Sequence, residues 1–117
     1  LLGAILVNNE ACDKVSGFLQ PEHFFEPLHA RIFEAASTLI KIGKLATPVT
    51  LRSYFENDAT MREIGGPAYL ARLAANATTI INAEEYGRTV YELAQRRKLI
   101  GVGTELVNEA FDPDIED

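Results

Sequence analysis

The clearest pattern of apolar and polar positions lies in residues 27–43, PLHARIFEAASTLIKIG. Apolar side chains recur there every three or four residues, and a narrow polar strip occupies the opposite face. That period predicts an amphipathic helix that several neighbours bury. Pro27 suits the first helical position, and Gly43 suits the residue just past the end, where a left-handed backbone is needed. We expect the chain to be organised around this helix, with Phe33 in the core.

The segments before this helix predict shorter elements. Residues 1–7 are apolar almost throughout, and we interpret them as a short buried helix because no later segment reads as a strand that would pair with them. A second short helix follows Asn8 and Asn9, runs to about Ser16 and turns Cys12 toward the core. A single turn begins at Pro21, after which Phe24 and Phe25 are expected to fold back onto the central helix.

The segments after the central helix are also short and marked by proline and glycine. Thr47 and Pro48 predict a capped helix start, with an apolar face made of Val49, Leu51, Tyr54 and Phe55. Residues 61–64 read as a turn, and the pair Gly65-Gly66 ends it before a helix over residues 67–75. This glycine pair is not a phosphate-binding loop, because no Lys-Ser/Thr follows it.

A long helix is predicted over residues 82–110, after a linker over 77–81. Asn82 and Glu85 have the spacing of a capping box. Glu84, Arg88, Glu92 and Arg96 alternate in sign every four residues, which is typical of a solvated face. Beyond them the helix is apolar around most of its circumference, and almost no chain remains to bury it. We therefore expect it to project from the globule and to bind a partner helix.

These elements predict an all-α fold without a sheet. Residues 1–81 form a compact bundle of short helices, and residues 82–117 contain the long projecting helix. Because the chain starts without Met in an apolar run and ends in an acidic tail, we interpret it as a piece of a longer protein.

Composition narrows the classes of function. The net charge of −6 argues against a general nucleic-acid surface, and no apolar run is long enough to cross a membrane. A single cysteine excludes an internal disulfide and suits a reducing compartment such as the cytoplasm. His23 and His29 lack further ligands at metal-binding spacing, so no metal site is predicted. Arg96, Arg97 and Lys98 point about 100° apart around a helix and do not make one basic patch.

Five stretches carry a resemblance to a known family. They are LLGAILVNNEACDKV, PEHFFEPLHARIFEA, PVTL, IGGPAYLARLA and NAEEYGRTVYELAQRRKLI, in this order along nearly the whole chain. Together they resemble the N-terminal domain of bacterial replicative DNA helicases of the DnaB type. The first stretch lacks the polar lead-in that the family usually has.

The resemblance implies that the long helix is the first arm of a helical hairpin. In the family these domains pair through their hairpins and stack as a trimer of dimers, forming a collar where primase docks and which a helicase loader contacts in some bacteria. The ATP-dependent unwinding activity, with its ATP and Mg, belongs to a C-terminal motor domain. For this chain the resemblance therefore implies an assembly module with no catalytic residue or cofactor of its own.

Two other readings remain beside the leading one: a small helical DNA-binding module, which the acidic balance disfavours, and a stand-alone enzyme, for which no nucleophile–base arrangement is evident. For the leading reading we predict partner contacts on the projecting helix and at the glycine corner, where Tyr69 and Leu70 are equally compatible with a core role. The predicted contact residues are Tyr69, Leu70, Leu99, Ile100, Val102, Leu106 and Val107.

Overall fold

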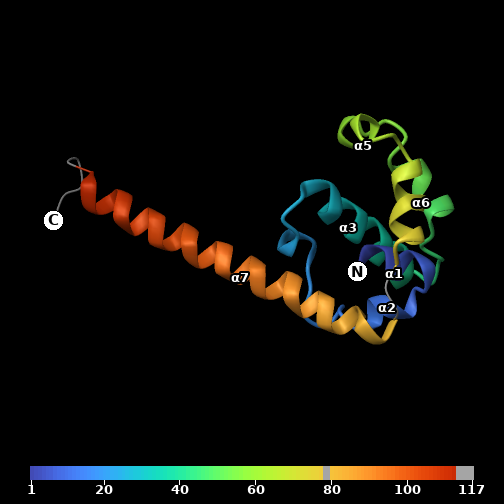
Figure 1. Ribbon diagram of the computed structural model, residues 1–117, viewed down its shortest axis with the longest axis horizontal. Helices are drawn as coiled ribbons and strands as arrows, with labels where there is room; N and C mark the ends of the chain where they lie inside the picture. The colour runs from blue at the N-terminus through green and yellow to red at the C-terminus, as the bar shows by residue number, and fades with distance from the viewer. Residues whose placement is uncertain (78–79, 113–117) are drawn as a thin grey trace.

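The computed structural model describes residues 1–77 and 80–112 (Figure 1). All regular elements in these residues are helical, in agreement with the all-α prediction. In chain order they are α1 (Leu2–Val7), α2 (Glu10–Asp13), the 3-10 turn η1 (Pro21–His23), α3 (Pro27–Lys41), α4 (Pro48–Leu51), the 3-10 turn η2 (Arg52–Tyr54), α5 (Ala59–Glu63), α6 (Ala68–Ala75) and α7 (Ile80–Phe111).

Helix α3 is the central helix that the sequence predicts, with both of its ends as expected. Pro27 is its first residue, and Gly43 follows its end with a φ of 79°. The N–H of Lys44 donates to the carbonyl of Leu39 at 2.9 Å, which is the six-to-one bond of a Schellman cap. Its apolar face is buried, and Phe33 retains only 2% of its exposure. Phe33 therefore lies in the core.

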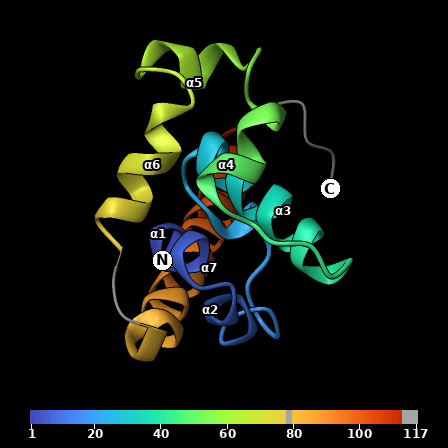
Figure 2. The ribbon, with the colours of Figure 1, turned by 90° about the vertical axis from the view of Figure 1, so that its right-hand side faces the viewer.

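Helix α1 packs against α6, and the two lie side by side in the end-on view of Figure 2. The backbones of the two segments approach closely there: a Cβ atom built on Gly3 would fall inside contact distance of the carbonyl of Leu73. Neighbouring α1 residues are buried as predicted, and Ile5 is fully enclosed. The absence of a side chain at Gly3 is thus what lets the two helices approach.

One long-range polar contact fixes the corner between α1 and α2. The side-chain amide of Asn9 donates to the carbonyls of Ile5, at 2.8 Å, and Ala46, at 2.7 Å, and its oxygen accepts from the N–H of Ala46 at 2.9 Å. Asn9 therefore holds the loop after α3 against the start of the chain. The sequence indicates only a local cap here, because a partner 37 residues away leaves no local signal.

The segment from α4 to α5 corrects part of the sequence prediction. Thr47 caps α4 by accepting from the N–H of Thr50 at 3.1 Å, as expected. Leu51 and Phe55 are buried, whereas Val49 is 82% and Tyr54 58% exposed. The reason is that α4 passes into a 3-10 turn after one α-helical turn, so a single 3.6-residue period does not hold along the segment.

A helix also occupies most of the segment that the sequence predicts to be a turn. Helix α5 begins at Ala59, and Asp58 caps it by accepting from the N–H of Met61 at 2.9 Å. The side chain of Met61 is fully buried. After α5, Gly65 and Gly66 both adopt positive φ, 111° and 75°, which gives the predicted corner before α6.

Helix α7 has 32 residues and leaves the globule as a straight projection (Figure 1). At 1.5 Å per residue it spans about 48 Å, and the longest dimension of the chain is 56 Å against 32 and 26 Å across. It begins at Ile80, so Asn82 lies inside the helix and the predicted cap at that residue is wrong. Of the predicted linker, residues 78–79 lie outside the described residues, as do residues 113–117 of the chain end.

Within the described residues, no helix combines the length and hydropathy needed to cross a bilayer.

Candidate interaction surface

The arm, residues 98–111 at the far end of α7, is the main apolar surface that the described chain leaves uncovered. Every residue in it is exposed. Its large apolar side chains retain from about half to more than four-fifths of their accessible area; they are Leu99 71%, Ile100 68%, Val102 48%, Leu106 63%, Val107 55% and Phe111 83%. Five of these are residues that the sequence nominates for partner contact, and Phe111 joins them here. Side chains so apolar and so exposed on one element are typical of a binding surface.

The arm also carries a heptad pattern. Leu99, Val102 and Leu106 follow one another at spacings of three and four, which places them along one side of the helix. Lys98 and Glu105 are seven residues apart and therefore flank that side together, one near each end. Gly101 and Gly103 lie between them, and a Cβ atom built on either would meet no other atom of the described chain within 4 Å. The geometry suits close packing of a second helix.

The other two nominated residues, Tyr69 and Leu70, follow the corner at Gly65-Gly66-Pro67 and differ in burial. Leu70 is completely buried and lies in the core. Tyr69 is partly buried, and its hydroxyl forms a 2.6 Å hydrogen bond with Nε2 of His29 on α3. The guanidinium of Arg72 lies 5.5 Å from the centre of the Tyr69 ring. Only Tyr69 of this pair therefore has surface left for a partner.

Burial lowers the pKa of His29, the histidine that is hydrogen-bonded to Tyr69. Loss of solvent around His29 lowers the pKa of its imidazole below the ordinary 6.5, and the positive N-terminus acts in the same direction, while the carboxylate of Glu26 partly opposes it. The neutral form is therefore favoured in the fold. A neutral ring bonded to Tyr69 ties α3 to α6 without placing a charge in the corner.

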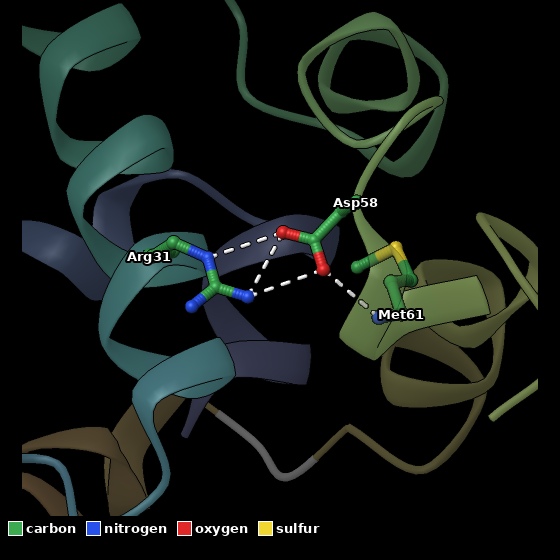
Figure 3. Close-up of polar contacts among 3 residues, drawn as sticks. All are labelled: Arg31, Asp58 and Met61. Atoms are coloured by element: carbon green, nitrogen blue, oxygen red, sulfur yellow. Dashed lines mark hydrogen bonds and ion pairs between the residues drawn. The ribbon is translucent and has the colours of Figure 1, made fainter. Parts of the chain in front are cut away.

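An ion pair between α3 and the residue before α5 is not evident from the sequence (Figure 3). Arg31 of α3 donates to both carboxylate oxygens of Asp58, with a shortest distance of 2.9 Å, while Asp58 also caps α5 through the N–H of Met61. The bond from Met61 is the largest cause that lowers the pKa of Asp58, and Arg31 adds to it. The signal that sequence reasoning missed is local: an Asp before a short helical segment is a standard N-cap.

The described residues offer little catalytic chemistry. Cys12 is 4% exposed, and its Sγ lies 3.9 Å from the hydroxyl of Ser37; burial is the largest cause that raises the pKa of its thiol. Cys12 is thus a core residue, as the sequence predicts, and a poor nucleophile. In residues 1–77 and 80–112 no three His, Cys, Asp or Glu side chains gather in a way that could hold a metal ion.

Positive charge is likewise not gathered into one patch. Arg31 is paired with Asp58, and Arg88 lies over the ring of Phe18 at 3.9 Å and within 3.7 Å of Glu84. Of the basic run in α7, Arg97 turns back toward the globule while its two neighbours face solvent. The three charges therefore point in different directions, as helical spacing predicts.

The sequence of this chain is similar to that of known proteins over nearly its whole length. Residues 1–92 match the family model described as the DnaB-like helicase N terminal domain. Among curated relatives, the replicative DNA helicase DnaB of Rickettsia felis is 47% identical over 116 residues, and that of Rickettsia typhi is 49% identical over 111 residues. These matches take in 99% and 95% of this chain but only 24% and 22% of the relatives, so the chain spans about a quarter of their length.

Two solved structures share the fold. The N-terminal domain of DnaB helicase from Mycobacterium tuberculosis superposes with a TM-score of 0.84 at 32% identity, over 95% of this chain and 80% of that one. A DnaB-like replicative helicase, solved to describe its interactions with primase, superposes with a TM-score of 0.72 at 26% identity, over 92% of this chain and 25% of that one. The likeness extends over the globule and most of the projecting helix.

Proposed function

This chain belongs to the family of DnaB-like helicase N-terminal domains, and from that premise we propose that it is the assembly and primase-docking module of a replicative DNA helicase. The observation that carries the proposal is the arm, an element of a folded chain whose large apolar side chains all face solvent. A monomer with this surface is prone to association, because covering apolar area is favourable at about 25 cal/mol per Å².

Self-association is the first part of the proposal. In an antiparallel pair of arms, the apolar side formed by Leu99, Val102 and Leu106 faces its own copy. A two-fold axis then brings Lys98 of one copy opposite Glu105 of the other, and the reverse pair follows by symmetry. Gly103, four residues after Leu99, lies beside this apolar side, where its missing side chain leaves room for the partner helix. In the complete helicase such pairs are the units of a trimer of dimers.

Primase docking is the second part. One structural relative was solved to describe the interactions of a DnaB-like helicase with primase, and this chain superposes on it over 92% of its own length. We propose that the arm and the exposed part of Tyr69 contribute to that contact here, and that a helicase loader is a further candidate for the same collar.

Catalysis is assigned to another part of the helicase. This chain has no Gly-x-x-x-x-Gly-Lys-Ser/Thr sequence, which is what binds nucleotide phosphates in helicase motors. We propose that ATP and Mg bind in the portion of the helicase that corresponds to the remaining three-quarters of the relatives' length. This module then works in the cytoplasm, where the chromosome is copied, without an activity of its own.

A calorimetric titration with the helicase-binding domain of a cognate primase tests the docking role. Leu106→Asp places a charge on the apolar side of the arm, while Asn108→Asp adds the same charge at an exposed polar position two residues away. Saturable binding that Asn108→Asp retains and Leu106→Asp loses by about tenfold or more supports the proposal, since burying an unpaired charge costs more than 1.4 kcal/mol. Equal binding by both variants would place docking elsewhere.

A further inference from the structure

A row of aromatic and arginine side chains joins the first half of α7 to the segment around η1. The guanidinium of Arg88 lies 3.9 Å from the centre of the Phe18 ring, and Phe18 meets Tyr91 edge-on with centroids 6.0 Å apart. Tyr91 in turn meets the ring of His23 at 4.9 Å. The contacts run along α7 in the direction of the arm.

Arg97 ends this row with two contacts at once. Its Nη2 donates to the backbone carbonyl of His23 at 2.8 Å, and its guanidinium carbon lies 5.4 Å from the centre of the Phe25 ring. From the next residue onward α7 is exposed throughout its described length, which Figure 1 shows as a helix with no neighbour. Arg97 is therefore where the arm leaves the globule.

This contact also accounts for Phe25, which the sequence places against α3. Phe24 does pack there, 5.1 Å from the ring of Phe33, whereas Phe25 is 73% exposed. The backbone of Phe24 is extended, so consecutive side chains point to opposite sides of the chain. The prediction for Phe25 is wrong because its ring faces α7 and not the core.

We propose that Arg97 is a positioning residue that fixes the direction in which the arm leaves the globule. A hydrogen bond to a carbonyl and a contact over a ring constrain the guanidinium in two different directions, which a planar, rigid group can satisfy together. The carbonyl it uses belongs to a closed turn, because the N–H of His23 donates to the carbonyl of Gln20 at 3.0 Å. The functional meaning of this direction rests on the proposed assembly role.

Because α7 extends far beyond the globule, the contacts of Arg97 have a large effect on where the end of the arm lies. Gly87 is a point of close approach between α7 and the globule, since a Cβ atom there would overlap the buried side chain of Val15. If α7 pivots at Gly87, Arg97 lies ten residues from the pivot and Phe111 twenty-four. A sideways slip of about 3 Å at Arg97 then becomes a sideways displacement of about 7 Å at Phe111. Such a displacement approaches the roughly 8–10 Å that separates the axes of packed helices, so it changes the angle at which the arm meets a partner helix.

Distances between two spin labels, measured by double electron–electron resonance, test this proposal. One label is attached at Glu63→Cys on α5, away from α7 in Figure 1, and the other at Asn108→Cys on the arm, with Cys12→Ala to remove the native thiol. Labelled protein is diluted in unlabelled protein so that only distances within one chain are read. The variants compared are Arg97→Ala, Arg97→Lys and, as the matched control, Arg96→Ala on the exposed side of α7.

The unsubstituted chain and Arg96→Ala are expected to give one narrow distance distribution. Arg97→Ala is expected to widen it by about twofold or more, and Arg97→Lys, which still carries a donor, to lie between. Thermal unfolding of the same samples checks that the globule stays folded; if Arg97→Ala unfolds it, Arg97→Lys, which loses the planar guanidinium that makes both contacts, gives the deciding distribution. A distribution as narrow in the deciding variant as in Arg96→Ala would overturn the proposal.

This result is separable from the assembly role, because the distance measurement needs no partner. If only about a tenth of the Arg97→Ala molecules hold the arm in the original direction, their apparent Kd for self-association rises about a hundredfold, because both copies of a pair must hold it. A widened distribution with an unchanged association constant would contradict the link to assembly while leaving the positioning role standing.

Discussion

Gly3→Ala adds only one methyl group, but it should destabilise the globule clearly. The added methyl group would fall inside contact distance of the carbonyl oxygen of Leu73, and it would lie 2.9 Å from the carbon of that carbonyl and 3.2 Å from the Cα of Ala77. All of these are backbone atoms, which cannot rotate away as a side chain can. Relief therefore requires α1 and α6 to move apart.

The expected magnitude combines two opposing effects. Overpacking a core typically costs about 1–3 kcal/mol, and a rigid backbone neighbour places this site at the upper end. Replacing glycine by alanine inside a helix returns about 1 kcal/mol. The net loss is therefore about 2 kcal/mol, which corresponds to a fall in Tm of roughly 10 °C for a chain of this size.

Chemical denaturation and thermal unfolding measure this directly, with Gly101→Ala as the matched control. Gly101 is also helical, but a Cβ atom there meets nothing of the described chain within 4 Å. Gly101→Ala should therefore leave the globule's transition where it is or raise it. If Gly3→Ala were as stable as the unsubstituted chain, the account of close α1–α6 packing would be refuted.

Three further predictions concern the globule. Phe33→Ala should lower the free energy of unfolding by about 3–5 kcal/mol, because the ring is almost fully buried; a loss below about 1 kcal/mol in denaturant would exclude it from the core. Thr47→Ala should cost about 1 kcal/mol in the same assay, and Thr47→Ser, which keeps the capping oxygen, clearly less. His29 favours its neutral form in the fold, so its contribution is present above pH 6.5 and is lost as the pH falls through the lowered pKa of the folded state. Unfolding in urea at pH 7.5 and pH 5 should show a smaller pH-dependent loss for His29→Gln; an equal loss would assign the effect to other groups.

Local sequence signals predict much of this fold because they mark the ends of several helices. Pro27 and Gly43 bound the central helix, and Thr47 with Pro48 starts α4. These residues act on backbone groups within a few positions of themselves, so the pattern is visible without knowledge of tertiary contacts. The same reasoning fails at Asn82, where a plausible capping pair lies inside a helix that begins at Ile80.

Long-range contacts and short elements mark the limit of sequence reasoning. Arg31 and Asp58 are 27 residues apart, so no local spacing indicates that they meet. The exposure of Val49 follows from a helix too short to define a period. The exposed arm, by contrast, was predictable because its apolar residues occupy most of the helix circumference, which is more than the preceding short helices can cover.

Sedimentation equilibrium over a range of protein concentrations tests the central claim most directly: that the arm binds a second copy of this chain. The account predicts that the unsubstituted chain and Asn108→Asp rise from the mass of one chain, 12.9 kDa, toward twice that value, while Leu106→Asp stays at the lower mass. An unsubstituted chain that remained at the mass of one chain throughout, or a Leu106→Asp variant that associated equally well, would contradict it.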